Sequence, residues 1–220
     1  MPEDVSDRFR VARNVMVETQ LRQRGIRDER VLSAMETVPR HEFIDPGYWG
    51  DAYADHPLPI ASGQTVSQPY IVAAMVEALA LRAEDKVLEV GTGTGYEAAV
   101  LARIAGQVYT IERHTGLARQ ANEILSRLGY KNVVVAVGDG SKGLPEQAPF
   151  DAIIVAAAAV RIPDALVAQL AEGGNMVIPV GPPDVQTLQL VRKLHGEPRI
   201  TQLDACRFVP LIDETRFFES

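Results

Sequence analysis

Apolar and polar residues alternate along this chain with two different periods. Residues 8–24 and 28–38 place apolar side chains three or four positions apart, which predicts two amphipathic helices. A third helix is predicted at residues 69–81, which open with a proline, a residue favoured at the first helical position. Residues 39–68 show no clear period and are rich in proline, glycine and aspartate, which predicts a long irregular segment of a kind that often has a function.

From residue 87 onward, short apolar runs alternate with helical patterns. The runs predict strands at residues 87–90, 108–111, 133–137, 152–156 and 176–180, with helices between them at residues 96–104, 115–128 and 163–170. Apolar strands that alternate with helices indicate a parallel sheet covered on both faces. Two later runs, at residues 187–192 and 203–211, predict an antiparallel pair at the end of the sheet.

The predicted fold class is therefore α/β. We expect a Rossmann-like, doubly wound and mostly parallel sheet of about seven strands, with helices on both faces and extra N-terminal helices. A length of 220 residues fits one domain over residues 1–220. Within it, a helical extension covers about residues 1–80, the sheet core about residues 85–182, and the C-terminal strands about residues 185–212.

The first strand of the alternating region ends in three glycines at alternate positions, Gly91, Gly93 and Gly95. Because glycine tolerates positive φ and has no Cβ, the chain can turn sharply there and a ligand can lie against bare backbone. Glu112 ends the next strand, 21 residues after Gly91. A glycine turn followed by an acid about 20 residues later is the pattern with which Rossmann-type folds bind an adenosine moiety.

The glycine spacing helps to choose between adenosine cofactors. The dinucleotide fingerprint is G-x-G-x-x-G, but here the third glycine comes one position early and Tyr96 stands in its place. The G-x-G-x-G form resembles the first motif of class I S-adenosylmethionine methyltransferases. The chain has no G-x-x-x-x-G-K-[ST] sequence, which counts against a P-loop. NAD binding, and a glycine turn that only joins strand to helix, stay open as alternatives.

Ligands of open α/β sheets bind beyond the carboxyl ends of the strands, so the residues that follow each strand are the candidates. They are Gly91, Thr92 and Gly93, then Glu112 with Arg113, then Asp139 with Gly140, and then the small residues 156–159. The Glu112 carboxylate is suited to accept hydrogen bonds from ribose hydroxyls, and Asp139 to accept one from the adenine amino group. The simpler alternatives are a surface ion pair of Glu112 with Arg113 and an ordinary turn at Asp139.

Composition and net charge argue against several classes of protein. A net charge of −7 argues against a general nucleic-acid binder, and no apolar run approaches the ~18–20 residues that span a bilayer. Residues 1–4 are acidic and lack the apolar region of a signal peptide. We therefore expect a soluble, cytoplasmic protein without a membrane partner.

Cysteine and histidine usage points to neither a disulfide nor a metal. The single cysteine, Cys206, lies in a predicted strand without a neighbouring histidine, so we interpret it as a small buried hydrophobic residue. The four histidines are scattered without metal-ligand spacing, so no metal site is expected.

Motifs before, around and after the glycine loop point to one family of methyltransferases. They are VPRHEF at residues 38–43, GQTVSQP at residues 63–69, VLEVGTGTGYEAAVLA at residues 87–102, and GDG at residues 138–140. Together they resemble the protein-L-isoaspartate (D-aspartate) O-methyltransferases, from about residue 20 to residue 212. The resemblance implies a protein-repair enzyme that transfers a methyl group from S-adenosyl-L-methionine to the free α-carboxylate of L-isoaspartyl and D-aspartyl residues, leaving S-adenosyl-L-homocysteine.

The resemblance also assigns the site. Ser67 is the implied catalytic residue, and damaged proteins and peptides are the implied partners. We expect the enzyme to be a monomer. The implied cofactor-binding residues are Gln64, Thr65, Val66, Ser67, Glu89, Gly91, Thr92, Gly93, Glu112, Arg113, Asp139 and Gly140. The implied substrate-binding residues are Ala61, Val66, Ser67, Val209, Pro210 and Leu211.

This chemistry needs no general base, because a carboxyl group with a pKa near 4 is already ionised at pH 7. Ser67 fits as a hydrogen-bond donor that orients the substrate carboxylate. Its alternative role is the N-cap of the helix that follows, where serine is also favoured. The two roles are compatible, so both stay open.

The sequence departs from the family pattern at three places. Glu97 stands where glutamine is common, Ala61 stands where many members have glycine, and residues 156–159 lack the threonine or glycine often found there. A class I methyltransferase that acts on a small molecule or on RNA is an alternative enzyme. A non-catalytic adenosine-binding module is an alternative of another class.

Overall fold

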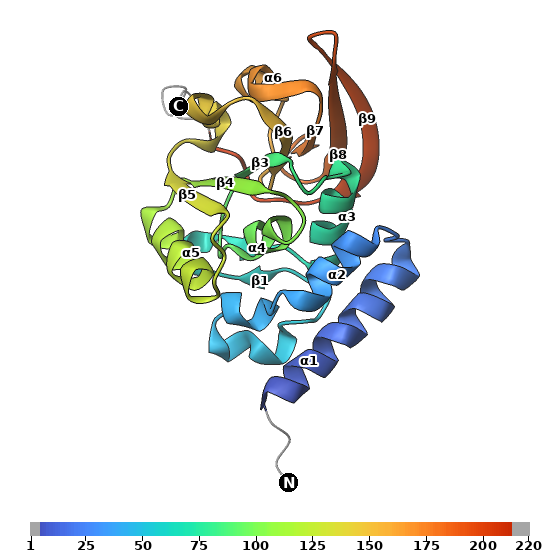
Figure 1. Cartoon of the computed structure of the whole chain (residues 1–220), viewed down its shortest axis with the longest axis vertical. Coiled ribbons are helices and arrows are strands. Elements are labelled where there is room, and N and C mark those ends of the chain that lie inside the picture. The colour runs from blue at the N-terminus through green and yellow to red at the C-terminus, as the bar shows by residue number, and fades with distance from the viewer. Residues whose placement is uncertain (1–4, 213–220) are drawn as a thin grey trace.

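A seven-stranded sheet organises the chain, and the computed structural model describes residues 5–212 of it (Figure 1). Residues 1–4, the acidic N-terminus considered above, and residues 213–220 lie outside the described part. The helices are α1 Val5–Val15, α2 Glu29–Thr37, α3 Pro69–Leu79, α4 Tyr96–Ala102, α5 Thr115–Arg127 and α6 Asp164–Gln169. The strands are β1 Leu58–Pro59, β2 Thr65–Val66, β3 Lys86–Val90, β4 Gln107–Glu112, β5 Val133–Val137, β6 Phe150–Val155, β7 Leu170–Val180, β8 Gln186–Leu194 and β9 Glu197–Cys206.

The strand order confirms the predicted fold class. The large sheet runs β5-β4-β3-β6-β7-β8-β9 and is parallel from β5 to β7, while β8 and β9 pair antiparallel at its end. The chain moves outward from β3 through β4 to β5 and then returns to β6 on the other side of β3. This reversal makes the carboxyl ends of β3 and β6 the point where a doubly wound sheet binds its ligand.

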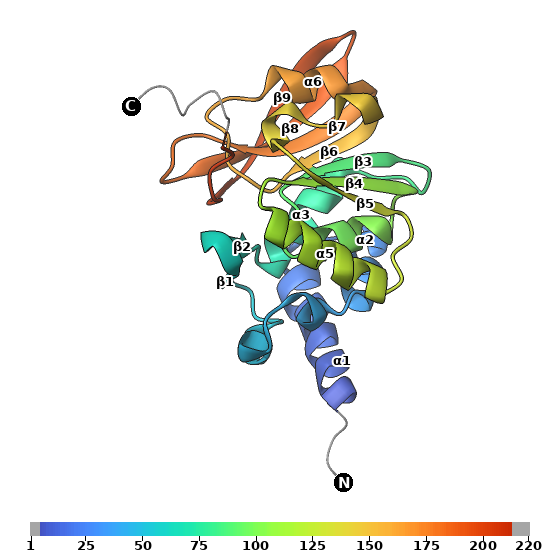
Figure 2. The same cartoon turned by 90° about the vertical axis from the view of Figure 1, so that its left-hand side faces the viewer.

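Two apolar cores lie on opposite faces of the sheet. Strand residues such as Val87 and Val108 pack against α2, α3 and α4, whereas others such as Leu88 and Ile153 pack on the other face with Leu166 of α6. Figure 2 shows α2, α3 and α5 below the sheet and α6 above it. The predicted coverage of both faces is confirmed, with most helices on one face.

The N-terminal helices largely follow the predicted pattern. α1 continues as a π-helical turn, Met16–Leu21, and ends at Gly25 in a left-handed conformation with φ 107°. α2 begins after Asp28, whose side chain accepts a hydrogen bond from the Arg30 backbone N–H. The predicted irregular segment at residues 39–68 contains only 3-10 turns and the short pair β1–β2, in which Leu58 lies opposite Val66.

The last strand was predicted at residues 203–211, and this prediction is wrong. β9 spans Glu197–Cys206 and follows β8 through a tight hairpin in which His195 and Gly196 have φ of 56° and 80°. Positive φ at both central residues is typical of the hairpin turn that matches the strand twist. Leu194 therefore pairs with Glu197, and the chain has left the sheet before Phe208.

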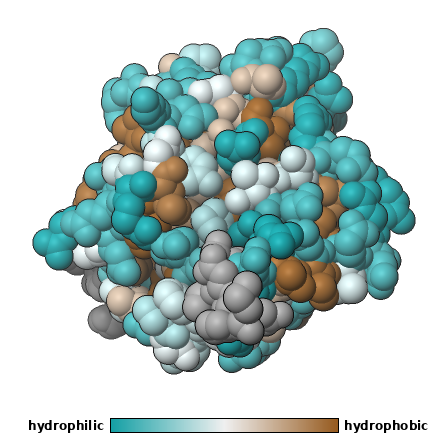
Figure 3. Space-filling view, turned by 60° about the horizontal axis from the view of Figure 1, so that its bottom comes forward, coloured by the Kyte–Doolittle hydropathy of each residue, from teal (hydrophilic) through white to brown (hydrophobic). Residues whose placement is uncertain are grey.

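The surface seen from the side of α1 is mainly hydrophilic, and its apolar residues form separate patches (Figure 3). In the described part of the chain, every helix is too short or too polar to cross a membrane. Residues 5–212 also hold no cluster of three or more histidine, cysteine, aspartate or glutamate side chains arranged to bind a metal ion.

Candidate active site

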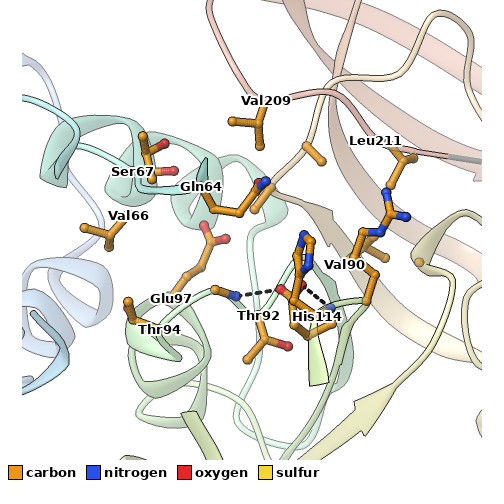
Figure 4. Close-up of a pocket in the computed structure, with 18 of the residues that line it drawn as sticks. Gln64, Val66, Ser67, Val90, Thr92, Thr94, Glu97, His114, Val209 and Leu211 are labelled. Carbon is orange, nitrogen blue, oxygen red and sulfur yellow. Dashed lines mark hydrogen bonds between the residues drawn. The ribbon is translucent and has the colours of Figure 1, made fainter. Parts of the chain in front are cut away.

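A pocket of about 820 Å³ of empty space, including its open mouth, lies at the carboxyl ends of β3, β4 and β6. Figure 4 shows Ser67 and Gln64 on one side, His114 on the other, and Glu97 directed into the space between. The pocket wall contains most of the predicted site residues, namely Gln64, Thr65, Val66, Ser67, Gly91, Thr92, Gly93, Glu112, Arg113, Gly140, Val209, Pro210 and Leu211. Ala61, Glu89 and Asp139 are not on this wall.

The glycine loop after β3 has the conformation that its sequence predicts. Gly91 and Gly93 have φ of 99° and 52°, a region that side chains with a Cβ rarely adopt. The Gly91 N–H donates to the carbonyl oxygen of Ile111 at 2.9 Å, which ties the loop to the end of β4. Gly140 is needed for a different reason, because a Cβ there would lie 2.5 Å from Cγ1 of Val90.

Glu112 lies at the end of β4 and is held by the backbone. It is only 6% exposed, its Oε2 accepts a hydrogen bond from the Gly93 N–H at 3.0 Å, and its Oε1 accepts one from the His114 N–H at 2.9 Å. The alternative of a surface ion pair with Arg113 is therefore wrong. A carboxylate offers about four acceptor positions, so each oxygen of Glu112 retains capacity for a ligand hydroxyl.

Asp139 caps the turn after β5. Its Oδ1 accepts hydrogen bonds from the Ser141 N–H and hydroxyl, and its Oδ2 lies 3.4 Å from Nζ of Lys142. Burial alone would raise the pKa of Asp139, but these hydrogen bonds and the lysine charge outweigh it and lower the pKa below its usual value. The turn interpretation is confirmed, and Asp139 stands behind Gly140 rather than on the pocket wall.

Ser67 lies between β2 and α3. The N-cap of α3 is Gln68, so the alternative role of Ser67 as the N-cap is wrong. Within residues 5–212 its hydroxyl bonds to no protein group, while its carbonyl oxygen accepts a hydrogen bond from Nη2 of Arg40 at 2.7 Å. A second cavity, lined by Tyr70 and Phe208 among others, adjoins the first, and the two share Thr65, Ser67, Ala156 and Val209. This serine therefore offers its hydroxyl where two cavities join.

The segment after β9 closes the pocket from above. The Ala158 N–H donates to the carbonyl oxygen of Val209 at 2.7 Å, and the Leu211 N–H donates to the carbonyl oxygen of Ala158 at 2.7 Å. These bonds bring Val209 and Leu211 to the same pocket wall as Ser67. Ala61, by contrast, is exposed and lines neither cavity.

Comparison with known proteins agrees with this geometry. The family model for protein-L-isoaspartate(D-aspartate) O-methyltransferase matches residues 12–216, which is most of the chain. The chain belongs to this family. The observed fold and the family match therefore agree, and this family is one of enzymes.

Relatives and solved structures of this methyltransferase family cover almost the whole chain. The protein-L-isoaspartate O-methyltransferase of Koribacter versatilis is 63% identical over 93% of this chain and 92% of its own length. That of Syntrophobacter fumaroxidans is 53% identical, with 93% and 95% covered. A solved protein-L-isoaspartate O-methyltransferase superposes with a TM-score of 0.83 at 30% identity, over 90% of this chain and 65% of that chain. A Plasmodium falciparum protein assigned to the same activity, solved in complex with S-adenosyl-L-homocysteine, gives a TM-score of 0.80 at 27% identity over 91% and 98%.

The main site residue of this methyltransferase that sequence reasoning missed is Glu97. It was considered only as a departure from the family pattern, yet it lines the pocket and is 9% exposed. Glu89, which was predicted to bind the cofactor, lies behind it and is fully buried. The signal was present in α4, because YEAAVLA is otherwise apolar all round and such a helix is buried on every side. Its one charged residue had to be buried as well.

Cys206 has a structural place in the methyltransferase. Its thiol is half-buried at the end of β9, which corrects the expectation of full burial. Burial raises the pKa of this thiol to about 11, so it stays protonated at neutral pH. A protonated thiol is a poor nucleophile, which agrees with the structural role predicted from the sequence.

Proposed function

We propose that this protein repairs damaged proteins by transferring a methyl group from S-adenosyl-L-methionine to the free α-carboxylate of L-isoaspartyl residues and, less well, to D-aspartyl side chains. The observation that carries the proposal is the Ser67 hydroxyl, which has no bonding partner among residues 5–212 and stands where two cavities meet. One cavity suits a cofactor and the other suits a peptide. The membership of the methyltransferase family supports both assignments.

The residues of the first cavity fit this cofactor. Glu112 offers acceptors for ribose hydroxyls, and the glycine loop leaves room for a ligand against the backbone. Thr94 is another lining residue, and its buried hydroxyl bonds to no group in the described chain. The acidic groups Glu97 and Glu112 suit a cofactor that has a cationic end and no phosphate. When bound, the cofactor supplies a methyl group on a sulfonium cation, which makes that methyl an electrophile.

The protein itself mainly positions the reacting groups and excludes water from the site. The substrate carboxylate is ionised at neutral pH and needs no base to act as the nucleophile. We infer that the Ser67 hydroxyl donates a hydrogen bond to this carboxylate and fixes its orientation. Val209 and Leu211 cover the site and reduce its contact with water. Such positioning supplies up to about 7–11 kcal/mol in favourable systems.

A pair of peptides that differ in one linkage tests the proposal. A peptide that contains L-isoaspartate should accept a labelled methyl group from S-adenosyl-L-methionine, and its normal aspartyl twin should stay at background. The two peptides have the same composition, so each serves as the control for the other. Equal labelling of both, or of neither, would overturn the proposed acceptor.

The cofactor site is tested through Glu112. Changing Glu112 to glutamine should weaken binding of S-adenosyl-L-homocysteine by about tenfold, because an amide retains a single acceptor oxygen while the Gly93 and His114 N–H groups both need one. Isothermal titration calorimetry measures the affinity. The matched control is Glu123→Gln on the exposed side of α5, where the affinity should not change. An affinity within twofold of wild type in Glu112→Gln would remove Glu112 from the cofactor site.

The proposal also covers oligomeric state, compartment and partners. We propose a monomeric cytoplasmic enzyme that uses neither nucleic acid nor membrane as a partner. A net charge of −7 supports this, since an RNA methyltransferase needs a basic face. Residues 156–159, which read AAAA, also lack an N/D-P-P-Y motif of the kind that a nucleic-acid methyltransferase carries after its fourth strand.

A further inference from the structure

Two carboxyl groups are buried side by side beneath the pocket. Glu89 is the fourth residue of β3 and is fully buried, and Glu97, in the first turn of α4, is 9% exposed and lines the pocket. Neither oxygen of Glu89 receives a hydrogen bond from a protein donor in the part of the chain that the structure describes. Among the same residues, no lysine or arginine forms an ion pair with either carboxyl.

Such a pair is not stable as two anions. Two ionised carboxylates offer each other only acceptors, and both would lose their hydration without a compensating cation. Burial raises the pKa of Glu97 to about 8, while burial and the neighbouring charge of Glu97 raise that of Glu89 well above its usual value. From β4, the nearby Thr110 hydroxyl lowers the pKa of Glu89 and Glu112 raises it, although in this geometry the Thr110 hydroxyl is paired with that of Thr92 at 2.6 Å. The free enzyme therefore holds protons on the pair at neutral pH.

The position of the pair in the pocket indicates what it faces. Glu112 marks the end of the pocket that suits the ribose, and it accepts a hydrogen bond from the N–H of His114, which Figure 4 labels. Ser67 marks the opposite end, where the methyl group must meet the substrate. Glu97 points into the pocket near this second end, so it lies on the side where the amino-acid part of the cofactor has to extend.

We propose that Glu97, supported by Glu89, binds the α-ammonium group of the cofactor's amino-acid end, and that one proton leaves the pair as the ammonium group binds. The ammonium group supplies the cation that the buried pair lacks. One carboxyl becomes ionised, its proton goes to water, and the remaining proton stays between the two carboxyls as a hydrogen bond. This inference rests on the proposed function only for the identity of the cofactor.

A glutamine at position 97 would behave differently. A glutamine side chain does not titrate, and its amide N–H donates to Glu89 directly, which favours an ionised Glu89 before any ligand arrives. A protein with glutamine therefore binds the same cofactor with little change in protonation. Glutamate at position 97 makes cofactor binding depend on pH.

Calorimetry with S-adenosyl-L-homocysteine tests the inference without any methyl transfer. This ligand keeps the α-ammonium group, which stays charged between pH 6 and pH 7.5. The association constant should rise over that range by up to about tenfold per pH unit. The reason is that the slope of its logarithm against pH equals the number of protons released on binding. At pH 7 the binding enthalpy should differ between phosphate and Tris buffers by an amount that corresponds to release of up to one proton.

Two controls separate the pair from the other titratable groups of the pocket. 5′-Methylthioadenosine keeps the nucleoside and the sulfur but lacks the amino-acid end, so its binding should release no proton, and any pH dependence of its binding comes from groups other than the carboxyl pair. Glu97→Gln should bind S-adenosyl-L-homocysteine with less than about a twofold change over the same pH range and with little proton release. Unchanged binding of 5′-methylthioadenosine shows that this variant is folded.

Two outcomes would overturn the inference. One is a Glu97→Gln variant that keeps the wild-type pH slope and proton release, and the other is an equal slope for 5′-methylthioadenosine on the wild-type protein. Should the variant fail to fold, the comparison of the two ligands on the wild-type protein still decides the question. Failure of the isoaspartyl peptide assay would overturn the proposed methyl acceptor and leave these binding results intact.

Discussion

Changing Ser67 to alanine is expected to lower methyl transfer to an isoaspartyl peptide about 10- to 150-fold, with little change in affinity for S-adenosyl-L-homocysteine. A hydrogen bond to a charged group contributes about 1.5–3 kcal/mol, and here the charged group is the nucleophile itself. The hydroxyl has no bonding partner within residues 5–212, so its removal breaks no contact of the folded protein. The rate of labelled methyl incorporation and the calorimetric affinity for S-adenosyl-L-homocysteine measure the two effects separately.

A matched control keeps this result specific. Ser126 is an exposed serine on α5 that lines neither cavity, and Ser126→Ala should retain wild-type turnover. Ser67→Thr restores a hydroxyl and should recover part of the lost rate. Wild-type turnover in Ser67→Ala would show that the serine does not orient the carboxylate. An equal loss of cofactor affinity would instead assign it to the cofactor site.

Much of the fold was predictable because the sheet is buried on both faces over its centre. β5 was predicted with its observed bounds, and β3, β4 and β6 within two residues at each end. β9 was not predictable by the same signal, since it is exposed along almost its whole length and has no apolar period. Its position follows instead from the His195-Gly196 hairpin, a turn signal that the strand pattern did not use.

The site residues could be predicted where the order of the strands in the sheet fixes their positions. Gly91 and Glu112 follow neighbouring parallel strands, so the topology alone brings them together. Glu97 was missed because a local departure from a motif does not tell which way a side chain points. Arg40 was missed for another reason, since it lies in the irregular segment and its contacts come from residues distant in sequence.

Arg40 connects that irregular segment to Ser67. It is fully buried, its Nε donates to the Ala52 carbonyl oxygen at 2.8 Å, and its Nη2 donates to the Ser67 carbonyl oxygen at 2.7 Å. Its guanidinium carbon lies 4.6 Å from the centre of the Tyr96 ring at the start of α4. Nη1 has no bonding partner in the described chain, and burial lowers the pKa of this guanidinium. Arg40 therefore joins the Ser67 side of the pocket to the helix that carries Glu97.

Replacing Arg40 by methionine should lower the free energy of unfolding by about 2–4 kcal/mol. Two carbonyl oxygens lose their donors at a cost of about 1–3 kcal/mol each. Removing the arginine charge offsets part of that cost, because a buried cation is itself destabilising. Urea denaturation measures the loss as a lower midpoint. Methyl transfer at a temperature where the variant is folded should also fall, because the Ser67 backbone loses its anchor.

Arg127→Met is the matched control, since Arg127 is a half-exposed arginine on α5 whose Nη1 lies 2.8 Å from the carboxylate of Glu42. An exposed ion pair contributes about 0–1 kcal/mol, so this variant should unfold near the wild-type midpoint. Arg40→Lys separates charge from geometry, because it keeps the cation but lacks the planar fork that reaches both carbonyls. If Arg40→Lys is as stable as wild type, a buried positive charge is sufficient there. If Arg40→Met is also as stable, Ser67 is positioned by β2 and α3 without Arg40.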